Sequence, residues 1–306
     1  GLLAGLDRLG RHPKRGMLAP NGIAHCGRIE SVDIGLERAP EERSAAPDTV
    51  MVLSSAEAAE LLPTRAHEAH KHACGHVLAV AGSRGMTGAA VLCARAALAS
   101  GAGLVSIAVP QSLLALVAPA CPACMTIPLP DNDSGVFTPE ACAALVPLLP
   151  HFDALAIGPG LGRAPATQQF LADLLTSLTA PAVLDADALN LLAVTPGLLT
   201  VLQSRPWVLT PHPGEFARVS GAAAGDGPAA RIAAAMAFAS EHALTLILKG
   251  HLSVIASPAH EPCLNPTGNP GMATAGAGDV LTGVAAALLA QRLAAFDAAR
   301  AAAYVH

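Results

Sequence analysis

The sequence predicts an α/β fold with a central, mostly parallel sheet and helices on both faces. From residue 50 onward, short apolar segments typical of buried strands alternate with alanine-rich helical segments. The main strand candidates span residues 76–81, 153–157, 181–184, 207–210 and 245–248. Each of them runs into a loop rich in glycine or charge. Because ligands gather at the carboxyl ends of parallel strands, these loops predict one shared site.

Composition limits the class of protein. The 306 residues can bury a sizeable core, and 52% of them are hydrophobic while only 13% are charged. The longest uncharged run, 96–130, is long enough to span a membrane, but Gly101, Gly103 and several prolines interrupt it. We therefore interpret it as a helix end, a buried strand at 104–109, a short helix and another strand. No membrane association is expected.

The net charge and the cysteine content further limit the binding partners and the metal or redox roles that are expected. A net charge of −5 and 3% aromatic residues argue against nucleic acid binding. The seven cysteines are scattered through mostly apolar segments, which suits reduced thiols in a cytoplasmic protein. Cys121-Pro-Ala-Cys124 has no second pair and no nearby histidine, so neither a metal nor a redox role is predicted for it.

The first two glycine-rich loops match no common nucleotide motif. Loop 82–88 lacks the Gly-Lys-Ser/Thr ending of a P-loop, because Gly88 is followed by Ala89 and Ala90. Loop 158–162 has arginine where a dinucleotide fingerprint has its third glycine. A hydride-transferring dehydrogenase is therefore disfavoured, and a plain tight turn stays open for each loop.

Polar residues follow the next two strands. Asp185 and Asp187 could neutralise Mg²⁺-bound phosphates, although Asp187 as a helix N-cap is an equal alternative. His212 lies between two prolines that fix its backbone, and Glu215 three residues later could orient it. A structural role for this histidine remains open.

Lys249 is one of three lysines and ends the apolar strand 245–248. A lysine in such a position costs free energy unless its ammonium meets an anion. Its alternative is a surface lysine whose stem alone is buried.

The segment 265–286 changes from a Gly/Pro-rich loop into an apolar helix. Unpaired N–H groups at the helix start, around Ala277 and Gly278, form an anion site that could hold a transferring phosphoryl group. Asp279 lies in the first turn, where it could remove a proton from an attacking hydroxyl. An ordinary helix N-terminus with a favourable carboxylate is the alternative.

At these residues the chain resembles the NAD(P)H-hydrate dehydratases of the ribokinase-like superfamily. Gly268-Asn-Pro-Gly-Met-Ala-Thr274, followed by Gly276-x-Gly-Asp-Val-Leu-Thr-Gly283, looks like their signature. The resemblance covers about residues 54–306. It implies a ribokinase-like α/β domain that uses ADP, or ATP, with Mg²⁺ to dehydrate (6S)-NADHX and NADPHX to NADH and NADPH, releasing AMP and phosphate. The expected partners are these hydrates and ADP, in a homo-oligomer.

The resemblance also implies roles for individual residues. The hydrated nicotinamide nucleotide would contact a set that includes the catalytic base, namely Gly88, Ala89, Ala90, Gly160, His212 and Asp279. The nucleotide co-substrate would bind Lys249, Gly250, His251, Leu252 and Ser253, together with Ala277 and Gly278. Two alternatives stay open: a ribokinase-like kinase for a small alcohol, and a nucleotide-binding protein without turnover.

The two ends depart from this pattern. Residues 26–35 resemble the last strand of a hydrate epimerase domain, so 1–45 is interpreted as a remnant of that domain and a linker. A plain tail is the alternative. The dehydratase domain would be 46–306, truncated at its C-terminus, because the family continues past His306 into a Gly-Asp segment. His70-Lys71-His72 also differs, because the family usually has glycine after His-Lys. The alanine-rich segment 297–305 offers little surface to bury and is expected to fray unless docked.

Overall fold

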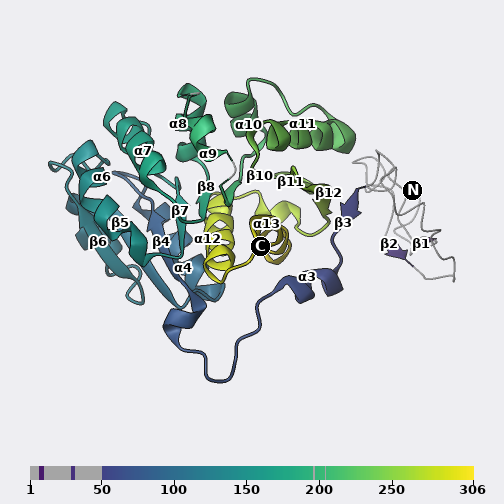
Figure 1. Ribbon diagram of the computed structural model, residues 1–306, viewed down its shortest axis with the longest axis horizontal. Coiled ribbons are helices and arrows are strands. Elements are labelled where there is room, and N and C mark those ends of the chain that lie inside the picture. The colour runs from purple at the N-terminus through teal and green to yellow at the C-terminus, as the bar shows by residue number, and fades with distance from the viewer. Residues whose placement is uncertain (1–6, 10–28, 32–49, 196, 204) are drawn as a thin grey trace.

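The computed structural model describes residues 7–9, 29–31, 50–195, 197–203 and 205–306. Ten strands form one sheet in the order β3-β12-β11-β10-β9-β8-β7-β4-β5-β6 (Figure 1). Their bounds are β3 Met51–Val52, β4 His76–Val80, β5 Leu104–Pro110, β6 Met125–Leu129, β7 Ala154–Ile157, β8 Ala182–Leu184, β9 Trp207–Leu209, β10 Thr245–Leu248, β11 Ser253–Ser257 and β12 His260–Asn265. All neighbours pair parallel except β10 with β11 and β11 with β12.

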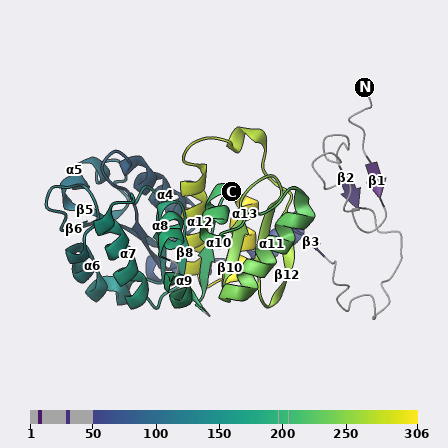
Figure 2. The same ribbon diagram turned by 90° about the horizontal axis from the view of Figure 1, so that it is seen from above.

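Helices cover both faces of this sheet (Figure 2). One layer holds α3 Ser55–Leu61, α4 Thr87–Ala99, α5 Leu114–Val117, α12 Ala277–Ala290 and α13 Ala295–Val305. The other holds α6 Pro139–Leu145, α7 Pro165–Ser177, α8 Asp187–Val194, α9 Gly197–Leu202, α10 Pro213–Ser220 and α11 Gly227–His242. Alternate residues of β4 point to opposite faces of the sheet. Val77 and Ala79 pack against the layer that contains α4 and α12, and Leu78 and Val80 pack against the layer that contains α6 and α7. The predicted α/β fold with a mostly parallel sheet is confirmed.

The central helix pair positions the predicted site. An added Cβ at Gly283 of α12 would collide with the carbonyl oxygen of Cys93 on α4, so glycine is required for this close approach. Every residue from 281 to 290 is buried. As a result, the first turn of α12 and the first turn of α4 both lie at the carboxyl edge of the sheet (Figure 1).

The alanine-rich segment 297–305 meets the condition on which its prediction depended. It is the docked helix α13, and its buried alanines include Ala298, Ala301 and Ala302. Asn265 Nδ2 donates to Ala303 O at 2.6 Å, and Thr267 Oγ1 donates to Tyr304 O at 3.1 Å. The segment was expected to fray unless docked, and it is docked, because small side chains let a helix pack closely on a sheet and on α12.

Other sequence expectations have mixed outcomes. Run 96–130 folds as predicted, into the end of α4, then β5, a short helical segment and β6. The antiparallel hairpin of β11 and β12 was not predicted. Among the described residues, no helix combines the length and apolarity needed to cross a membrane. The described cysteines carry free thiols. Strands β1 Asp7–Leu9 and β2 Ile29–Ser31 form a separate parallel pair, and the rest of 1–49 lies outside the described residues.

Candidate active site

Two glycine-rich loops form one wall of the site. Gly82 N donates to Pro159 O at 2.8 Å, which joins the loop after β4 to the loop after β7. Gly160 has φ +58°, and an added Cβ there would stand 2.9 Å from the Cβ atoms of Met86 and Ala89. Glycine is therefore required at 160 for both backbone and space. The predicted hydrate-binding residues Gly160 and Ala89 do come together.

The remaining predicted residues of this wall differ in access. Gly88 is exposed and has open space around it. Ala90 is fully buried in the core under α4, so its side chain faces protein rather than solvent. A ligand at the start of α4 can therefore contact Gly88 and Ala89, whereas Ala90 packs in the core.

A strained residue separates the two predicted metal ligands. Ala186 adopts φ 49° and ψ −117°, a region that side chains rarely enter. Asp185 points toward α12 and β10, where its Oδ1 accepts from Lys249 Nζ at 2.7 Å and its Oδ2 from Thr282 Oγ1 at 2.7 Å. Asp187 points away, and its Oδ2 accepts from Gly162 N at 2.9 Å.

Asp185 and Asp187 belong to different hydrogen-bond networks, so a Mg²⁺ ion held here would take one of the two carboxylates together with phosphate oxygens of the nucleotide. All carboxylate oxygens of Asp185 and Asp187 already accept hydrogen bonds, Asp187 Oδ1 from Asn190 Nδ2 at 3.3 Å. Within the described residues, no group of three or more His, Cys, Asp or Glu side chains could hold a metal ion. Nor does Asp187 cap its own helix, because it is the first residue of α8 and binds the neighbouring loop instead.

His212 caps helix α10. Its Nδ1 accepts from Gly214 N at 3.0 Å and from Glu215 N at 3.3 Å, and its backbone N donates to Glu215 Oε2 at 2.8 Å. Because Nδ1 accepts, the ring proton lies on Nε2, which is 3.4 Å from Glu215 Oε1. The side chain is half exposed, so the ring can still face a ligand.

Lys249 lies between two buried carboxylates. Its Nζ is 2.7 Å from Asp185 Oδ1 and 3.8 Å from Glu215 Oε2. An added Cβ at Gly278 would stand 3.3 Å from the same Nζ. The ammonium thus meets anions, but these are protein carboxylates, Asp185 after β8 and Glu215 in α10. Glu215 also links Lys249 to His212, two residues that were predicted on different ligands.

Asp279 lies in the first turn of α12, beside this ion pair. Burial, followed by the negative charge of Asp185, raises the pKa of Asp279 to about 6, while Lys249 opposes the rise. A carboxyl with a pKa close to neutral can hold or release a proton at working pH, which is what a general base requires. Ala277 N–H donates to Thr274 O at 3.4 Å. The amides of Gly278 and Asp279 therefore supply the unpaired donors at this helix start.

The loop after β10 forms the opposite wall. Gly250 and His251 are exposed, Leu252 is buried with φ 53°, and Ser253 Oγ donates to Gly250 O at 3.1 Å. Arg231 of α11 supports the loop from behind through its backbone carbonyls.

Sequence reasoning missed three supporting residues. Thr282 lies one turn after Asp279 in the motif, and its Oγ1 donates to Asp185. Glu215 was noted only as a partner of His212, whereas it also approaches Lys249. Thr282 and Glu215 both lie inside motifs that the sequence analysis singled out, so their positions could have identified them. Nothing in the sequence singles out Arg231.

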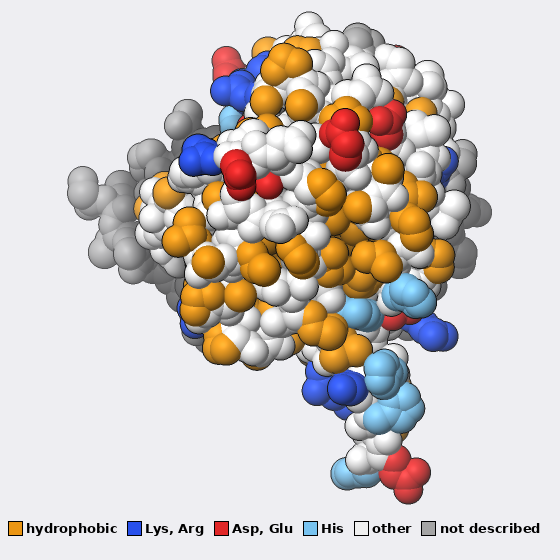
Figure 3. All heavy atoms as spheres, turned by 90° about the vertical axis from the view of Figure 1, so that its left-hand side faces the viewer, with side chains coloured by type: hydrophobic (Ala, Val, Ile, Leu, Met, Phe, Trp, Pro, Cys, Tyr) orange, Lys and Arg blue, Asp and Glu red, His pale blue; other side chains and the backbone are white. Residues whose placement is uncertain are grey.

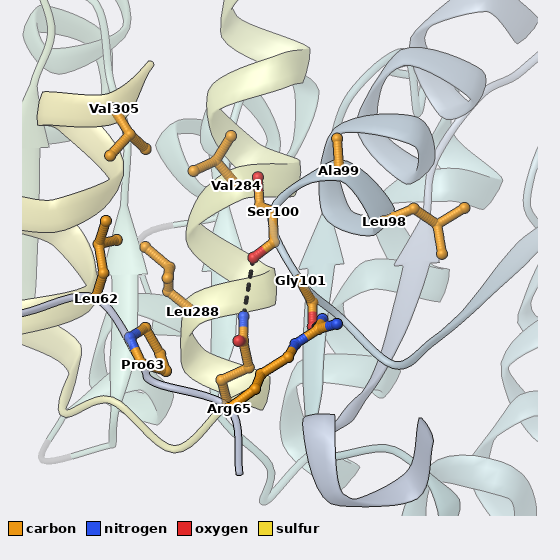
Figure 4. A pocket seen from close by; sticks show the side chains of 11 residues that line it. Leu62, Pro63, Arg65, Leu98, Ala99, Ser100, Gly101, Val284, Leu288 and Val305 are labelled. Carbon is orange, nitrogen blue, oxygen red and sulfur yellow. Dashed lines mark hydrogen bonds between the residues drawn. The ribbon is translucent and has the colours of Figure 1, made fainter. Parts of the chain in front are cut away.

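An apolar groove lies away from the candidate active site. A groove of about 620 Å³ runs between the C-terminal halves of α4 and α12 and the chain after α3 (Figure 4). Its lining is mostly apolar, with Leu98, Val284 and Leu288, and Gln291 Nε2 donates to Ser100 O at 3.0 Å across it. Arg65 is the one charged residue of its lining, with no carboxylate beside it there, and the groove lies at the opposite ends of the helices from Asp279. We assign it no catalytic role.

The comparisons with known proteins decide between the alternatives. Residues 77–306 match the family described as NAD(P)H-hydrate dehydratase. The chain belongs to this family. The resemblance predicted from the 268–283 signature is thereby confirmed, and a small-alcohol kinase is less well supported.

The relatives of this dehydratase-family chain include NAD(P)H-hydrate repair enzymes and dehydratases. It is 44% identical over 295 residues to the bifunctional NAD(P)H-hydrate repair enzyme Nnr of Moorella thermoacetica, covering 96% of the chain and 55% of that protein. It is 38% identical over 244 residues to the ADP-dependent (S)-NAD(P)H-hydrate dehydratase of Neisseria meningitidis, covering 79% of the chain and 78% of the relative. The chain thus spans about half the length of the bifunctional relatives it matches.

Solved structures confirm the ribokinase-like fold. A ribokinase-like superfamily protein from Enterococcus faecalis superposes with a TM-score of 0.72 at 28% identity, covering 84% of this chain and 86% of that one. The ADP/ATP-dependent NAD(P)H-hydrate dehydratase of Bacillus subtilis, co-crystallised with ATP and Mg²⁺, superposes with a TM-score of 0.66 at 30% identity, covering 85% and 88%.

Proposed function

We propose that the chain is an ADP-dependent hydro-lyase that returns (6S)-NADHX and NADPHX to NADH and NADPH, releasing AMP and phosphate. The observation that carries the proposal is Asp279, whose pKa is raised to about 6 at the first turn of α12. The glycine-rich wall lies on one side of it and the Lys249 loop on the other. A base between two ligand-sized walls suits transfer of a phosphoryl group from one ligand to a hydroxyl of the other.

The proposed first step is phosphoryl transfer. The Asp279 carboxylate takes the proton from the ring hydroxyl, and the hydroxyl oxygen attacks the β-phosphorus of ADP. The bond from that phosphorus to the bridging oxygen breaks, and AMP leaves with the electron pair. The unpaired amides of Gly278 and Asp279 would face the transferring phosphoryl group, and the Lys249 ammonium lies beside them.

The proposed second step is elimination. The lone pair of the ring nitrogen expels phosphate from the carbon that carried the hydroxyl, and a proton leaves the adjacent ring carbon to form the double bond. Asp279 then returns its proton to solvent. His212, whose ring is half exposed and has Nε2 3.4 Å from Glu215 Oε1, would orient the hydrate. A bound Mg²⁺ would neutralise charge on the phosphates, with Asp185 or Asp187 as its carboxylate ligand, and no step is assigned to it.

Product analysis tests the proposal. The chain is incubated with NADH hydrate and ADP, ATP or no nucleotide, and NADH, AMP and phosphate are quantified against an enzyme-free control. A dehydratase gives NADH and AMP in equal amounts with ADP and nothing without nucleotide. A stable phosphoester would indicate a kinase, and binding without products would indicate a nucleotide-binding protein. Either of these results would overturn the proposal.

We further propose that the chain acts as a homo-oligomer in the cytoplasm. Apolar side chains gather on the side of the molecule that carries the β6 edge (Figure 3), where Leu116 is 62% and Met125 46% exposed. Exposed apolar surface beside an unpaired edge strand favours association. Light scattering should give a mass above the 30.6 kDa of one chain, and Met125→Lys should lower it. A wild-type mass of one chain would contradict this proposal.

A further inference from the structure

The guanidinium of Arg231 donates hydrogen bonds to three backbone carbonyl groups at the loop after β10. Arg231 Nη1 donates to His251 O at 2.6 Å, and Nη2 donates to Leu248 O at 3.1 Å and to Lys249 O at 3.3 Å. Arg231 Nε is buried and has no hydrogen-bond partner among the described residues. The terminal nitrogens are thus committed to this loop, even though one donor of the side chain is left unpaired.

These contacts orient the amides of the loop. In a trans peptide unit the C=O and N–H groups point in opposite directions. Because the carbonyls of Lys249 and His251 point at Arg231, the N–H groups of Gly250 and Leu252 point away from it. Within the described chain neither amide donates a hydrogen bond to another backbone or side-chain group. The loop therefore presents two free donors on the face opposite Arg231.

The loop backbone is shaped to fit this support. Gly250 has φ +148°, and an added Cβ there would stand 2.8 Å from Arg231 Nη2. Leu252 has φ 53°, a conformation that a leucine adopts only when its surroundings hold it there. Closely spaced amides in such turns bind anionic oxygens.

We propose that Arg231 is a positioning residue that fixes the 249–252 loop so that the amides of Gly250 and Leu252 bind a phosphate oxygen of the nucleotide. This inference rests on the proposed function for the identity of the nucleotide. Arg231 acts from behind the loop and does not touch the ligand. A lysine cannot replace it fully, because a single ammonium cannot reach carbonyls on both sides of the turn with a planar fork of donors.

The test is the affinity for AMP, measured by calorimetry on the full chain, together with KM for ADP and kcat. Arg231→Met should weaken AMP binding and raise KM for ADP on the order of 10–100-fold, as expected for lost charge-assisted hydrogen bonds. The kcat at saturating ADP should stay within about twofold, because Asp279 and Lys249 remain in place. Arg231→Lys should recover part of the affinity.

Arg205→Met is the matched control. Arg205 also donates to a backbone carbonyl, that of Leu178, and its guanidinium lies 5.2 Å from the Trp207 ring centre, remote from the loop. This variant should melt at a lower temperature yet bind AMP like the wild type.

Three results would overturn the inference. They are wild-type AMP affinity in a folded Arg231→Met variant, equal losses of AMP affinity in the Arg231→Met and Arg205→Met variants, and full affinity in Arg231→Lys. If Arg231→Met does not fold, the lysine variant alone decides. A wild type that binds AMP but leaves the hydrate unchanged would overturn the proposed function instead, while the Arg231 comparison could still be read.

Discussion

The two walls of the site are built in different ways. The wall assigned to the hydrate is made from backbone, because the Gly82 amide joins the loops after β4 and β7 and Gly160 lets them approach closely. The wall assigned to the nucleotide is held by charged side chains from distant parts of the chain. Lys249 pairs with Asp185, 64 residues earlier, and Asp185 accepts from Thr282, 97 residues later.

This difference predicts how each wall fails. A wall made of backbone is disrupted by steric overlap, so an added methyl group should weaken the binding of one ligand and change little else. In a wall of buried charges, removing one charged side chain leaves its partner without a counter-charge, so protein stability and ligand binding should both decrease. Asp279 lies where the two walls meet, and its replacement should spare both.

Asp279→Asn should have the largest effect on turnover. It preserves size and removes the base, so kcat should fall on the order of 10²–10⁴-fold, while AMP binding changes little. Calorimetry with AMP and initial rates with NADH hydrate measure the two quantities. Near-normal kcat in a folded variant would exclude Asp279 as the base.

The same variant should be more stable than the wild type above pH 6. The pKa of Asp279 is about 6 in the fold and about 3.9 in an unfolded chain. The folded state therefore binds more protons between these values, and stability falls as pH rises through that window. Asp279→Asn should gain on the order of 1–3 kcal/mol at pH 8 and nothing below about pH 4. Equal gains at both pH values would contradict the assignment.

Lys249→Met tests the charged wall. It leaves the buried Asp185 without its cation, which should cost about 3–5 kcal/mol of unfolding free energy as well as nucleotide affinity. The double variant Lys249→Met with Asp185→Asn should recover part of that stability, because no unpaired charge remains. Urea unfolding of both single variants and the double variant gives the coupling. Strictly additive effects would show that the pair does not couple.

Gly160→Ala tests the backbone wall and should have the smallest of these effects. The strain and overlap at φ +58° should weaken hydrate binding on the order of tenfold and leave AMP binding unchanged. Gly85→Ala is the control, since Gly85 has φ +87° but no atom within 4 Å of an added Cβ. The hypothesis of a steric wall would be wrong if both variants lost hydrate affinity equally.

The walls also differ in how far the sequence predicts them. Asp279 was identified because the helix start that carries it is encoded locally, whereas Gly88 and Gly160 were assigned to the hydrate through the family resemblance. Lys249 was identified by its rarity and strand position, but its partners Asp185 and Glu215 could not be assigned, because they meet it only after the strands are arranged. Arg231 left no local signal.

The fold shows the same division. The alternation of strands and helices predicted the parallel sheet, since each unit is local. The β11–β12 hairpin was not predicted, because its antiparallel pairing breaks the alternation of strand and helix. The sequence left the docking of α13 open, because the burial of Ala301 and Ala302 depends on a surface formed by α12 and the sheet.

The pH dependence of turnover tests the central claim most directly, that Asp279 between the two walls is the base. With saturating ADP and the enzyme-free rate subtracted, kcat/KM for NADH hydrate is measured from pH 5 to 8 while circular dichroism confirms folding. Because the unprotonated carboxylate is required and its pKa is about 6, kcat/KM should fall toward tenfold per pH unit below pH 6. The residual rate of Asp279→Asn should lack this limb. A wild-type rate that stays flat from pH 8 to 5 would contradict the account.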